Sequence, residues 1–245
     1  MSQVAALPTR RDEDFRYADL AALTPLWPVA AEQVRVPGGE AQTMTLILAG
    51  GEAVARELVV TLGAGASFDL RVLNANGAYG RVALRAELGE GANFTLGAAQ
   101  LAAGEQVLEI VTQVVHAAPD AVSRQIVRSV AGGQASVNYL GKVLVAKGAN
   151  GTDGEQSVRA MLLDRTATAN ARPELEIHAD DVKCAHGCAV GELDANGLFY
   201  MAARGIPPET AKRLMLQAFV AEAFAGAAEE EALLEQALAA LEAML

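Results

Sequence analysis

The chain has 245 residues, of which 52% are hydrophobic and only 4% aromatic, and its formal net charge is −11. This acidic balance, without a dense Lys/Arg cluster, argues against a nucleic-acid partner, because contact with a phosphate backbone requires clustered cations. The length predicts one domain, or one domain with a small appendage. A core built from small aliphatic side chains favours narrow, repetitive layers over a bulky globular centre.

Features that decide the cellular compartment point to the cytosol. Residues 1–20 carry acids and bases throughout and show no apolar segment of a secretory signal. No apolar run approaches the ~18 residues that span a bilayer, so no membrane contact is expected. The two cysteines do not make a disulfide framework. We therefore predict a cytoplasmic protein in a reducing compartment.

Residues 1–30 are expected to form an N-terminal arm. They begin polar and end in a segment, 17–27, whose apolar residues can anchor a short helix to the body of the protein. Pro25 and Pro28 limit any helix to the part that precedes them. Trp27, the single tryptophan, is expected to be a packing anchor.

From residue 31 the pattern changes to short runs of β-branched and aliphatic residues. Turn signals such as Gly132-Gly133 separate these runs every ~8–15 residues, which is typical of an all-β domain. In the run 81–88 the apolar residues alternate and are expected to share the core face. Arg81, Arg85 and Glu87 are expected to face outward.

Three all-β architectures fit this pattern: a sandwich, a jelly roll and a right-handed parallel β-helix. The β-helix would explain the small aliphatic core, because each coil stacks one layer of inward side chains on the next. Strict sequence repeats are absent, however, so periodicity alone leaves the choice open.

After Arg204 the chain is expected to become helical. Pro207-Pro208-Glu209 is a favourable helix start, and Gly226 separates a first helix from a second. The expected apolar faces are Ala211, Leu214, Met215, Ala218 and Phe219 in the first helix, and Leu234, Leu238, Leu241 and Leu245 in the second. Two such helices cannot bury both faces alone, so they either pack on the β domain or dock a partner.

The stretch 173–206 carries the most chemistry. It holds both cysteines of the chain in the pattern Cys184-x-His186-x-Cys188. Side chains two apart on a strand lie on one face, so all three donors can point the same way. Thiolate and imidazole suit zinc, copper or iron–sulfur chemistry, but three ligands on one strand do not enclose a metal alone. A further ligand would come from elsewhere or from another chain; alternatively, the cysteines are small hydrophobes.

Four segments also carry a family resemblance, and together they cover much of the chain. They are PTRRDEDFRYADL at 8–20, NYLGKVLVAKGANGTDGEQSVRAMLL at 138–163, RPELEIHADDVKCAHG at 172–187 and VGELDANGLFYMAARGI at 190–206. These segments resemble the SufB/SufD family of iron–sulfur cluster assembly proteins. The Lys-Cys-x-His-Gly segment at 183–187 is similar to the SufD branch of that family.

The resemblance implies a fold and a function. The expected domains are the arm (1–30), a right-handed parallel β-helix core (31–203) and a C-terminal helical domain (204–245). The implied function is that of a non-catalytic scaffold, which pairs with a SufB-like subunit through the β-helix and docks a SufC-like ATPase through the C-terminal helices. A transient iron–sulfur cluster would form at the SufB–SufD interface, and this chain would bind no nucleotide. A homodimer of the isolated chain is left open.

The same resemblance assigns the ligands. His186 and Cys184 match the histidine and cysteine of the family's cluster site. Cys188 stands where the family usually has alanine, so it is either a small hydrophobe, an added ligand or a persulfide acceptor. Asp180 and Asp181 either orient His186 or cap a turn.

Relative to the family pattern, the helical domain that precedes the Arg-Tyr-x-Asp-Leu segment is largely missing. Two other functions are weighed: a metal-dependent enzyme on a β-helix scaffold, for example one acting on carbohydrate, and a purely structural partner of SufB.

Overall fold

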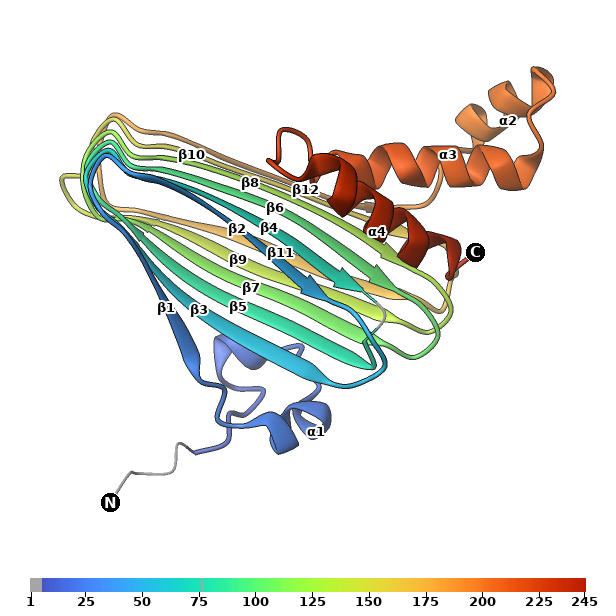
Figure 1. Cartoon of the computed structure of the whole chain (residues 1–245), viewed down its shortest axis with the longest axis horizontal. Helices are drawn as coiled ribbons and strands as arrows, with labels where there is room; N and C mark the ends of the chain where they lie inside the picture. The colour runs from blue at the N-terminus through green and yellow to red at the C-terminus, as the bar shows by residue number, and fades with distance from the viewer. Residues whose placement is uncertain (1–5, 76) are drawn as a thin grey trace.

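The computed structural model describes residues 6–75 and 77–245, which form a flattened solenoid of β-strands (Figure 1). Successive strands alternate between two facing six-stranded sheets, so that two strands complete one coil. The ladders in both sheets are parallel. Sandwiches and jelly rolls are built from antiparallel sheets. The structure therefore confirms the parallel β-helix that the family resemblance implied.

The two sheets are named here by their strands, in spatial order. Sheet A consists of β1 (Ala31–Val36), β3 (Val54–Leu62), β5 (Tyr79–Leu88), β7 (Val107–His116), β9 (Ser136–Val145) and β11 (Thr168–Ile177). Sheet B consists of β12 (Lys183–Gly191), β10 (Asp153–Leu162), β8 (Val122–Ala131), β6 (Asn93–Ala102), β4 (Ser67–Ala75) and β2 (Ala41–Leu48).

The main core lies between the two sheets. The parallel register places inward side chains of successive coils directly over one another, so the core is built from stacked columns. Phe68 and Phe94 occupy one column, with ring centroids 6.3 Å apart. Removing such apolar area from water stabilises the coils by roughly 25 cal/mol per Å². The expected alternation within 81–88 is confirmed for Val82, Leu84, Ala86 and Leu88, which are buried.

An N-terminal arm crosses the outer face of sheet A. It contains η1 (Glu13–Phe15), α1 (Leu20–Leu23) and η2 (Thr24–Leu26), and it ends at a cis peptide before Pro28. The Asp19 side chain caps α1 by accepting hydrogen bonds from two backbone N–H groups of its first turn. Residues 1–5 of the expected arm lie outside the described part of the chain.

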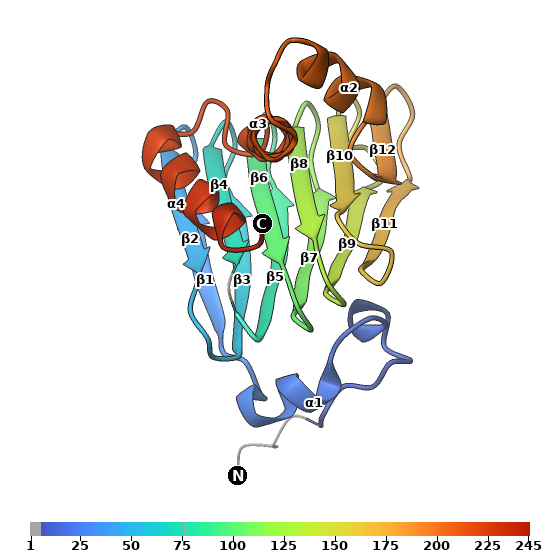
Figure 2. The same ribbon diagram turned by 90° about the vertical axis from the view of Figure 1, so that its right-hand side faces the viewer.

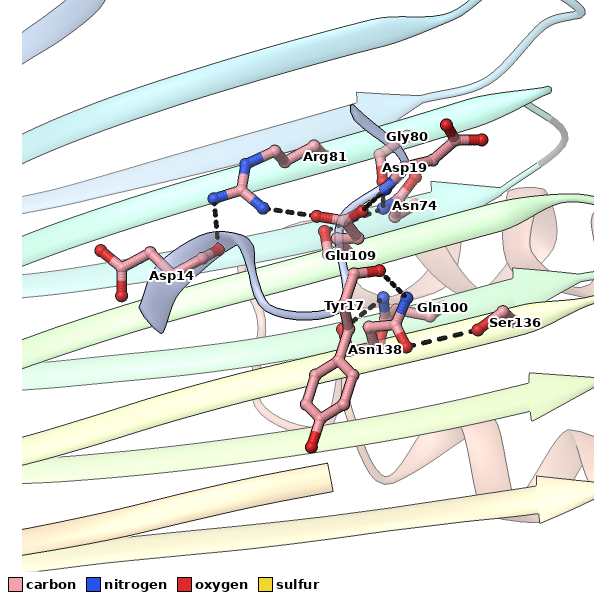
Figure 3. A network of polar contacts seen from close by, with 10 residues as sticks. All are labelled: Asp14, Tyr17, Asp19, Asn74, Gly80, Arg81, Gln100, Glu109, Ser136 and Asn138. Atoms are coloured by element: carbon pink, nitrogen blue, oxygen red, sulfur yellow. Dashed lines mark hydrogen bonds and ion pairs between the residues drawn. The ribbon is translucent and has the colours of Figure 1, made fainter. Parts of the chain in front are cut away.

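A buried ion pair between Arg81 and Glu109 fixes the arm to the sheet (Figure 3). Arg81 also donates to the Asp14 carbonyl oxygen at 2.9 Å, and Glu109 accepts from the Asp19 N–H at 3.1 Å. The Arg81 guanidinium lies 4.4 Å from the centre of the Phe15 ring. Arg81 points away from the core as expected, but the prediction that it faces solvent is wrong: it is 4% exposed, because the arm covers it.

Helices α3 (Pro208–Ala221) and α4 (Glu230–Glu242) cover the outer face of sheet B, opposite the arm (Figure 2). Helix α2 (Ala195–Ala203) packs against α3 and projects away from the sheet (Figure 1). Helix α2 begins before Arg204, earlier than expected, because the Asp194 carboxylate accepts from the N–H groups of Asn196 and Gly197 and caps it. No helix in the described ranges is long and apolar enough to cross a membrane.

The sheet-facing sides of α3 and α4 differ from the expected stripes. Leu214, expected to be inside, is 42% exposed, whereas Leu216 is fully buried. A second hydrophobic cluster, separate from the main core, joins sheet B to these helices. Its helical side consists of Leu216, Val220, Ala223, Phe224, Leu233, Ala237, Ala240 and Leu241. Small residues decide these faces because they let the helices approach the sheet closely. At Gly97 of β6, a Cβ atom would lie 1.9 Å from the Ala223 carbonyl oxygen.

Two arginines of sheet B fix the end of α3. Arg71 donates to the carbonyl oxygens of Ala223 and Ala225 at 3.0 and 3.3 Å, and pairs with Asp69. Arg128 pairs with Glu222 at 2.7 Å, and burial is the main cause that lowers the pKa of Arg128. Cations at the C-terminal end of a helix are favoured by its dipole.

Candidate functional site

The thiol and imidazole groups lie on the last strand of sheet B. In the described part of the chain, β12 pairs with β10 alone, so its other edge is unpaired. Cys184, His186 and Cys188 are in register with Gly154, Gln156 and Val158 of β10, which are buried in the solenoid. The three donors therefore share the interior-facing side of β12, as the alternation predicted. We call these three residues the donor row.

The donor row cannot hold one metal ion by itself. Alternate residues of a strand are about 6.6 Å apart along the chain. Two atoms bound to one ion at 2.0–2.3 Å are separated by at most about 4.6 Å. Consistent with this spacing, no group of three His, Cys, Asp or Glu side chains within residues 6–75 and 77–245 converges on a possible metal position. Any ion bound here needs donors from outside the row.

The two thiols differ in their surroundings. Cys184 is half-buried and packs against the main core, whereas the Cys188 Sγ lies 3.8 Å from the Ala171 carbonyl oxygen and its residue is exposed. Burial raises the pKa of both thiols, and for Cys184 a hydrogen bond from the Gly154 backbone acts in the opposite direction. Both groups are thus held as thiols near neutral pH, and binding a metal would release their protons.

The solenoid is open where the donor row lies. Opposite the row, Ala171, Pro173 and Leu175 of β11 occupy the interior-facing positions, in register with buried residues of β9. All three are only partly buried, because no further coil within the described residues covers them. Proline in a strand is typical of a sheet edge, since it donates no ladder hydrogen bond. The open end therefore combines apolar interior side chains with three soft or borderline ligands.

The acidic residues beside the row are placed differently. Asp180 and Asp181 lie in the turn between β11 and β12, and Asp181 adopts a positive φ of 48°. The Asp181 carbonyl oxygen accepts from the Gly151 N–H at 2.9 Å, which fixes the turn to the preceding coil. No hydrogen bond joins either carboxylate to His186 in the described ranges. Asp181 thus takes part in the turn through its backbone, and the role of the two carboxylates stays a prediction.

A buried polar network lies behind the row, and the sequence reading missed it. Gln156 donates through Nε2 to the Tyr139 hydroxyl at 3.1 Å, which lies 3.1 Å from Thr112 Oγ1. Thr112 donates to Gln125 Oε1 at 3.2 Å. Gly141 makes room, because a Cβ there would lie 2.1 Å from the Tyr139 hydroxyl. The sequence could have indicated this network, because Gln125 in strand 122–131 and Gln156 in strand 153–162 stand at positions whose alternation directs them into the core.

A second exposed surface lies on the helices. Helix α2 has no buried residue, and its Phe199 and Tyr200 are 76% and 58% exposed. Arg204 lies over the Tyr200 ring at 4.5 Å, and Leu214 of α3 is also exposed. Large aromatic side chains that remain outside a core are typical of protein-binding surfaces.

Fold and site together define a β-solenoid protein whose donor groups lie on an unpaired sheet edge instead of in an enclosed pocket. A family profile described as "SUF system FeS cluster assembly, SufBD core domain" matches residues 45–219, which is well over half of the chain. The chain belongs to the SufBD family of iron–sulfur cluster assembly proteins.

Individual relatives support the same family. The chain is 32% identical to the iron–sulfur cluster assembly protein SufD of Escherichia coli over 151 residues, which is 62% of this chain and 36% of that protein. It is 34% identical to the SufD of Bacillus subtilis over 118 residues, covering 48% and 27% of the two chains. It is 40% identical to the chloroplastic protein ABCI7 of Arabidopsis thaliana over 119 residues, covering 48% and 25%. The matched segments thus span about a third or less of these relatives.

Proposed function

We propose that the chain is a non-catalytic scaffold subunit of a SufBCD-type complex, and that it supplies ligands to a nascent iron–sulfur cluster at an interface with a SufB-like subunit. The observation that carries this proposal is the position of the donor row on the free edge of β12. Donors that cannot enclose an ion within their own chain are suited to share one with a partner.

The partner is proposed to cover the open end of the solenoid. An unpaired strand edge offers its backbone N–H and C=O groups to another strand. The partly buried apolar residues of β11 would be removed from water by the same contact. Covering the end would also shield a growing cluster from oxygen and competing thiols.

His186 is proposed as the main ligand and Cys184 as the second, with Cys188 as a weaker candidate. Imidazole binds iron less tightly than a full set of thiolates, which suits a cluster that must be released. The raised pKa of the Cys184 thiol points the same way, because a thiol that resists deprotonation is a weaker ligand.

The C-terminal helices are proposed to dock a SufC-like ATPase. The exposed aromatic residues Phe199 and Tyr200 of α2 provide the contact, while α3 and α4 transmit it to sheet B through their buried cluster. This chain itself is proposed to bind no nucleotide.

The test is co-expression with the SufB-like and SufC-like chains of the same organism, followed by anaerobic size-exclusion chromatography with light scattering. We expect a stable complex of all three chains. Phe199→Ala with Tyr200→Ala is expected to release the ATPase but retain the SufB-like chain. A protein that elutes alone in every condition would contradict the scaffold role, and binding of a divalent metal by that lone chain would favour a metal-dependent enzyme.

Ligation is tested in the assembled complex through its iron and acid-labile sulfide content. His186→Ala is expected to leave the complex intact and to abolish cluster accumulation. Arg85→Ala, a substitution on the exposed outer face of sheet A, is the matched control. Unchanged cluster content in His186→Ala would show that this chain is only a structural partner.

A further inference from the structure

A buried amide lies directly behind the exposed histidine of the donor row. Gln156 on β10 and His186 on β12 are register partners, and both occupy the interior-facing side of their strands. Neighbouring strands are about 4.8 Å apart, so the two side chains start from adjacent positions in one column. Gln156 is 1% exposed, whereas His186 is exposed at the open end.

The buried network fixes one end of this amide. The Tyr139 hydroxyl accepts from Gln156 Nε2 at 3.1 Å, and the hydroxyls of Tyr139 and Thr112 both lie within hydrogen-bond distance of Gln125 Oε1, at 3.5 and 3.2 Å. The donor end of Gln156 is therefore directed across the interior to sheet A.

The acceptor end of the same amide is left over. Gln156 Oε1 is buried and has no hydrogen-bond partner in the described part of the chain. A buried acceptor without a donor is unfavourable and calls for an explanation. Two donors adjoin it in the column: Gln125 Nε2, which is also buried without a partner, and the ring of His186, which makes no hydrogen bond or ion pair within residues 6–75 and 77–245. An unused acceptor and an unused donor thus occupy adjacent rungs.

We propose that Gln156 is a positioning residue for His186: when a partner covers the open end, one ring N–H of His186 donates to Gln156 Oε1. A histidine that donates from one ring nitrogen presents the lone pair of the other, so this bond selects the nitrogen that faces iron. It also fixes the orientation of a ring that solvent otherwise leaves free. The inference rests on the proposed role of His186 as a ligand.

Substitutions that remove one or both hydrogen-bonding groups of Gln156 distinguish a role in positioning His186 from a role in packing alone. Gln156→Leu removes donor and acceptor together. Gln156→Glu keeps an acceptor oxygen beside His186 and removes the amide donor to Tyr139. Gln125→Leu is the matched control, because Gln125 is buried in the same column and the same network but lies one coil further from His186.

The experiment uses the co-purified complex in which only this chain carries ¹⁵N-histidine. Solid-state NMR of the sedimented complex reads the tautomer of the His186 ring. Of the three histidines in the chain, His186 is assigned by its loss in His186→Ala. Iron and acid-labile sulfide are measured on the same preparations.

We expect a single neutral tautomer of His186 in the wild type and in Gln125→Leu, and a mixture in Gln156→Leu. Loss of a group that orients a metal-binding histidine typically costs 10–100-fold, so Gln156→Leu should accumulate at least about tenfold less cluster. Gln156→Glu should recover most of that loss. If the amide served only the network, Gln156→Glu would be as impaired as Gln156→Leu.

The inference is overturned if Gln156→Leu keeps a single tautomer, or if the wild type already shows a mixture. Should Gln156→Leu fail to assemble, the wild-type tautomer and the cluster content of Gln156→Glu still decide the question. His186→Ala distinguishes failure of the proposed ligand role of His186 from failure of the positioning role of Gln156. If His186→Ala still accumulates cluster, the proposed ligand role of His186 is wrong. If His186→Ala loses the cluster but Gln156→Leu keeps a single His186 tautomer, only the role of Gln156 is wrong.

Discussion

The second and last coils of the solenoid share one backbone but differ in what fills them. The interior columns of sheet B, followed from β4 to β12, are Phe68-Phe94-Ser123-Gly154-Cys184, Leu70-Leu96-Gln125-Gln156-His186 and Val72-Ala98-Val127-Val158-Cys188. The early members are apolar and buried, whereas each column ends in a thiol or an imidazole group. The same inward position thus stabilises the fold at one end of the solenoid and presents chemistry at the other.

This difference follows from the geometry of a stacked fold. A coil with neighbours on both sides buries its inward residues, and apolar side chains suit that place. Within residues 6–75 and 77–245 the last coil has a neighbour on one side only, so its inward residues are partly or fully exposed. Stability and function are therefore expected to respond to substitutions at opposite ends of one column.

The largest expected effect is on the early end of the first column. Phe94→Ala should lower the free energy of unfolding by roughly 3–5 kcal/mol, because it removes a fully buried ring and leaves a cavity beside Phe68. Urea denaturation followed by circular dichroism measures this change. A loss below about 1 kcal/mol would mean that the early coils do not carry the stability of the solenoid.

An intermediate effect is expected at His116 of β7, a buried residue of sheet A that contacts Ser123 in the first column. Burial lowers the pKa of His116 to about 4 from 6.5, and its Nε2 lies 2.9 Å from Ser123 Oγ. Between pH 6.5 and 4 the unfolded chain therefore binds a proton that the folded chain does not. The free energy of unfolding should fall with decreasing pH by about 1.4 kcal/mol per unit, or roughly 3 kcal/mol in total.

Denaturation midpoints measured across that pH range test the effect of His116. His116→Gln keeps a hydrogen-bonding side chain but does not titrate, so its stability should depend less steeply on pH over this window. Equal slopes in both proteins would assign the pH dependence to other groups. Asp153, whose pKa is lowered mainly by its hydrogen bond from Arg124, would be the next group to examine, at lower pH.

The smallest stability effect is expected at the late end of the columns. Cys188→Ala and His186→Ala should each change the free energy of unfolding of the isolated chain by less than about 0.5 kcal/mol, because both residues are exposed. Denaturation of the two variants beside Phe94→Ala makes the comparison direct. A loss of 2 kcal/mol or more in either variant would show that the donor row is structural.

Local sequence patterns predicted the strands of this protein better than they predicted how surfaces are covered. Alternation identified the core side of 81–88, but nothing local indicates that the arm buries Arg81 with Glu109, which lies on another strand. The apolar faces of the helices were misjudged for a related reason. Leu214 was expected on the apolar face of α3 but is 42% exposed, whereas Leu216, which was not, is buried in the cluster with sheet B.

In the candidate site, too, local sequence predicted some features and missed those that depend on distant strands. The spacing of Cys184, His186 and Cys188 fixes their common face, because strand geometry is local. The network behind them joins four strands, so its hydrogen bonds depend on a register that no single segment encodes. The family resemblance supplied the parallel stacking that periodicity left open.

The uncovered edge of β12 also affects the tendency of the chain to aggregate. Strands that end a sheet are usually blunted by charged residues, proline or a covering element. In β12 the one charged side chain is Lys183, at the start of the strand, and the remainder is small or apolar apart from His186. Copies whose β12 edge is uncovered therefore present unpaired backbone groups to one another, so self-association through this edge is expected to increase with the concentration of the isolated chain.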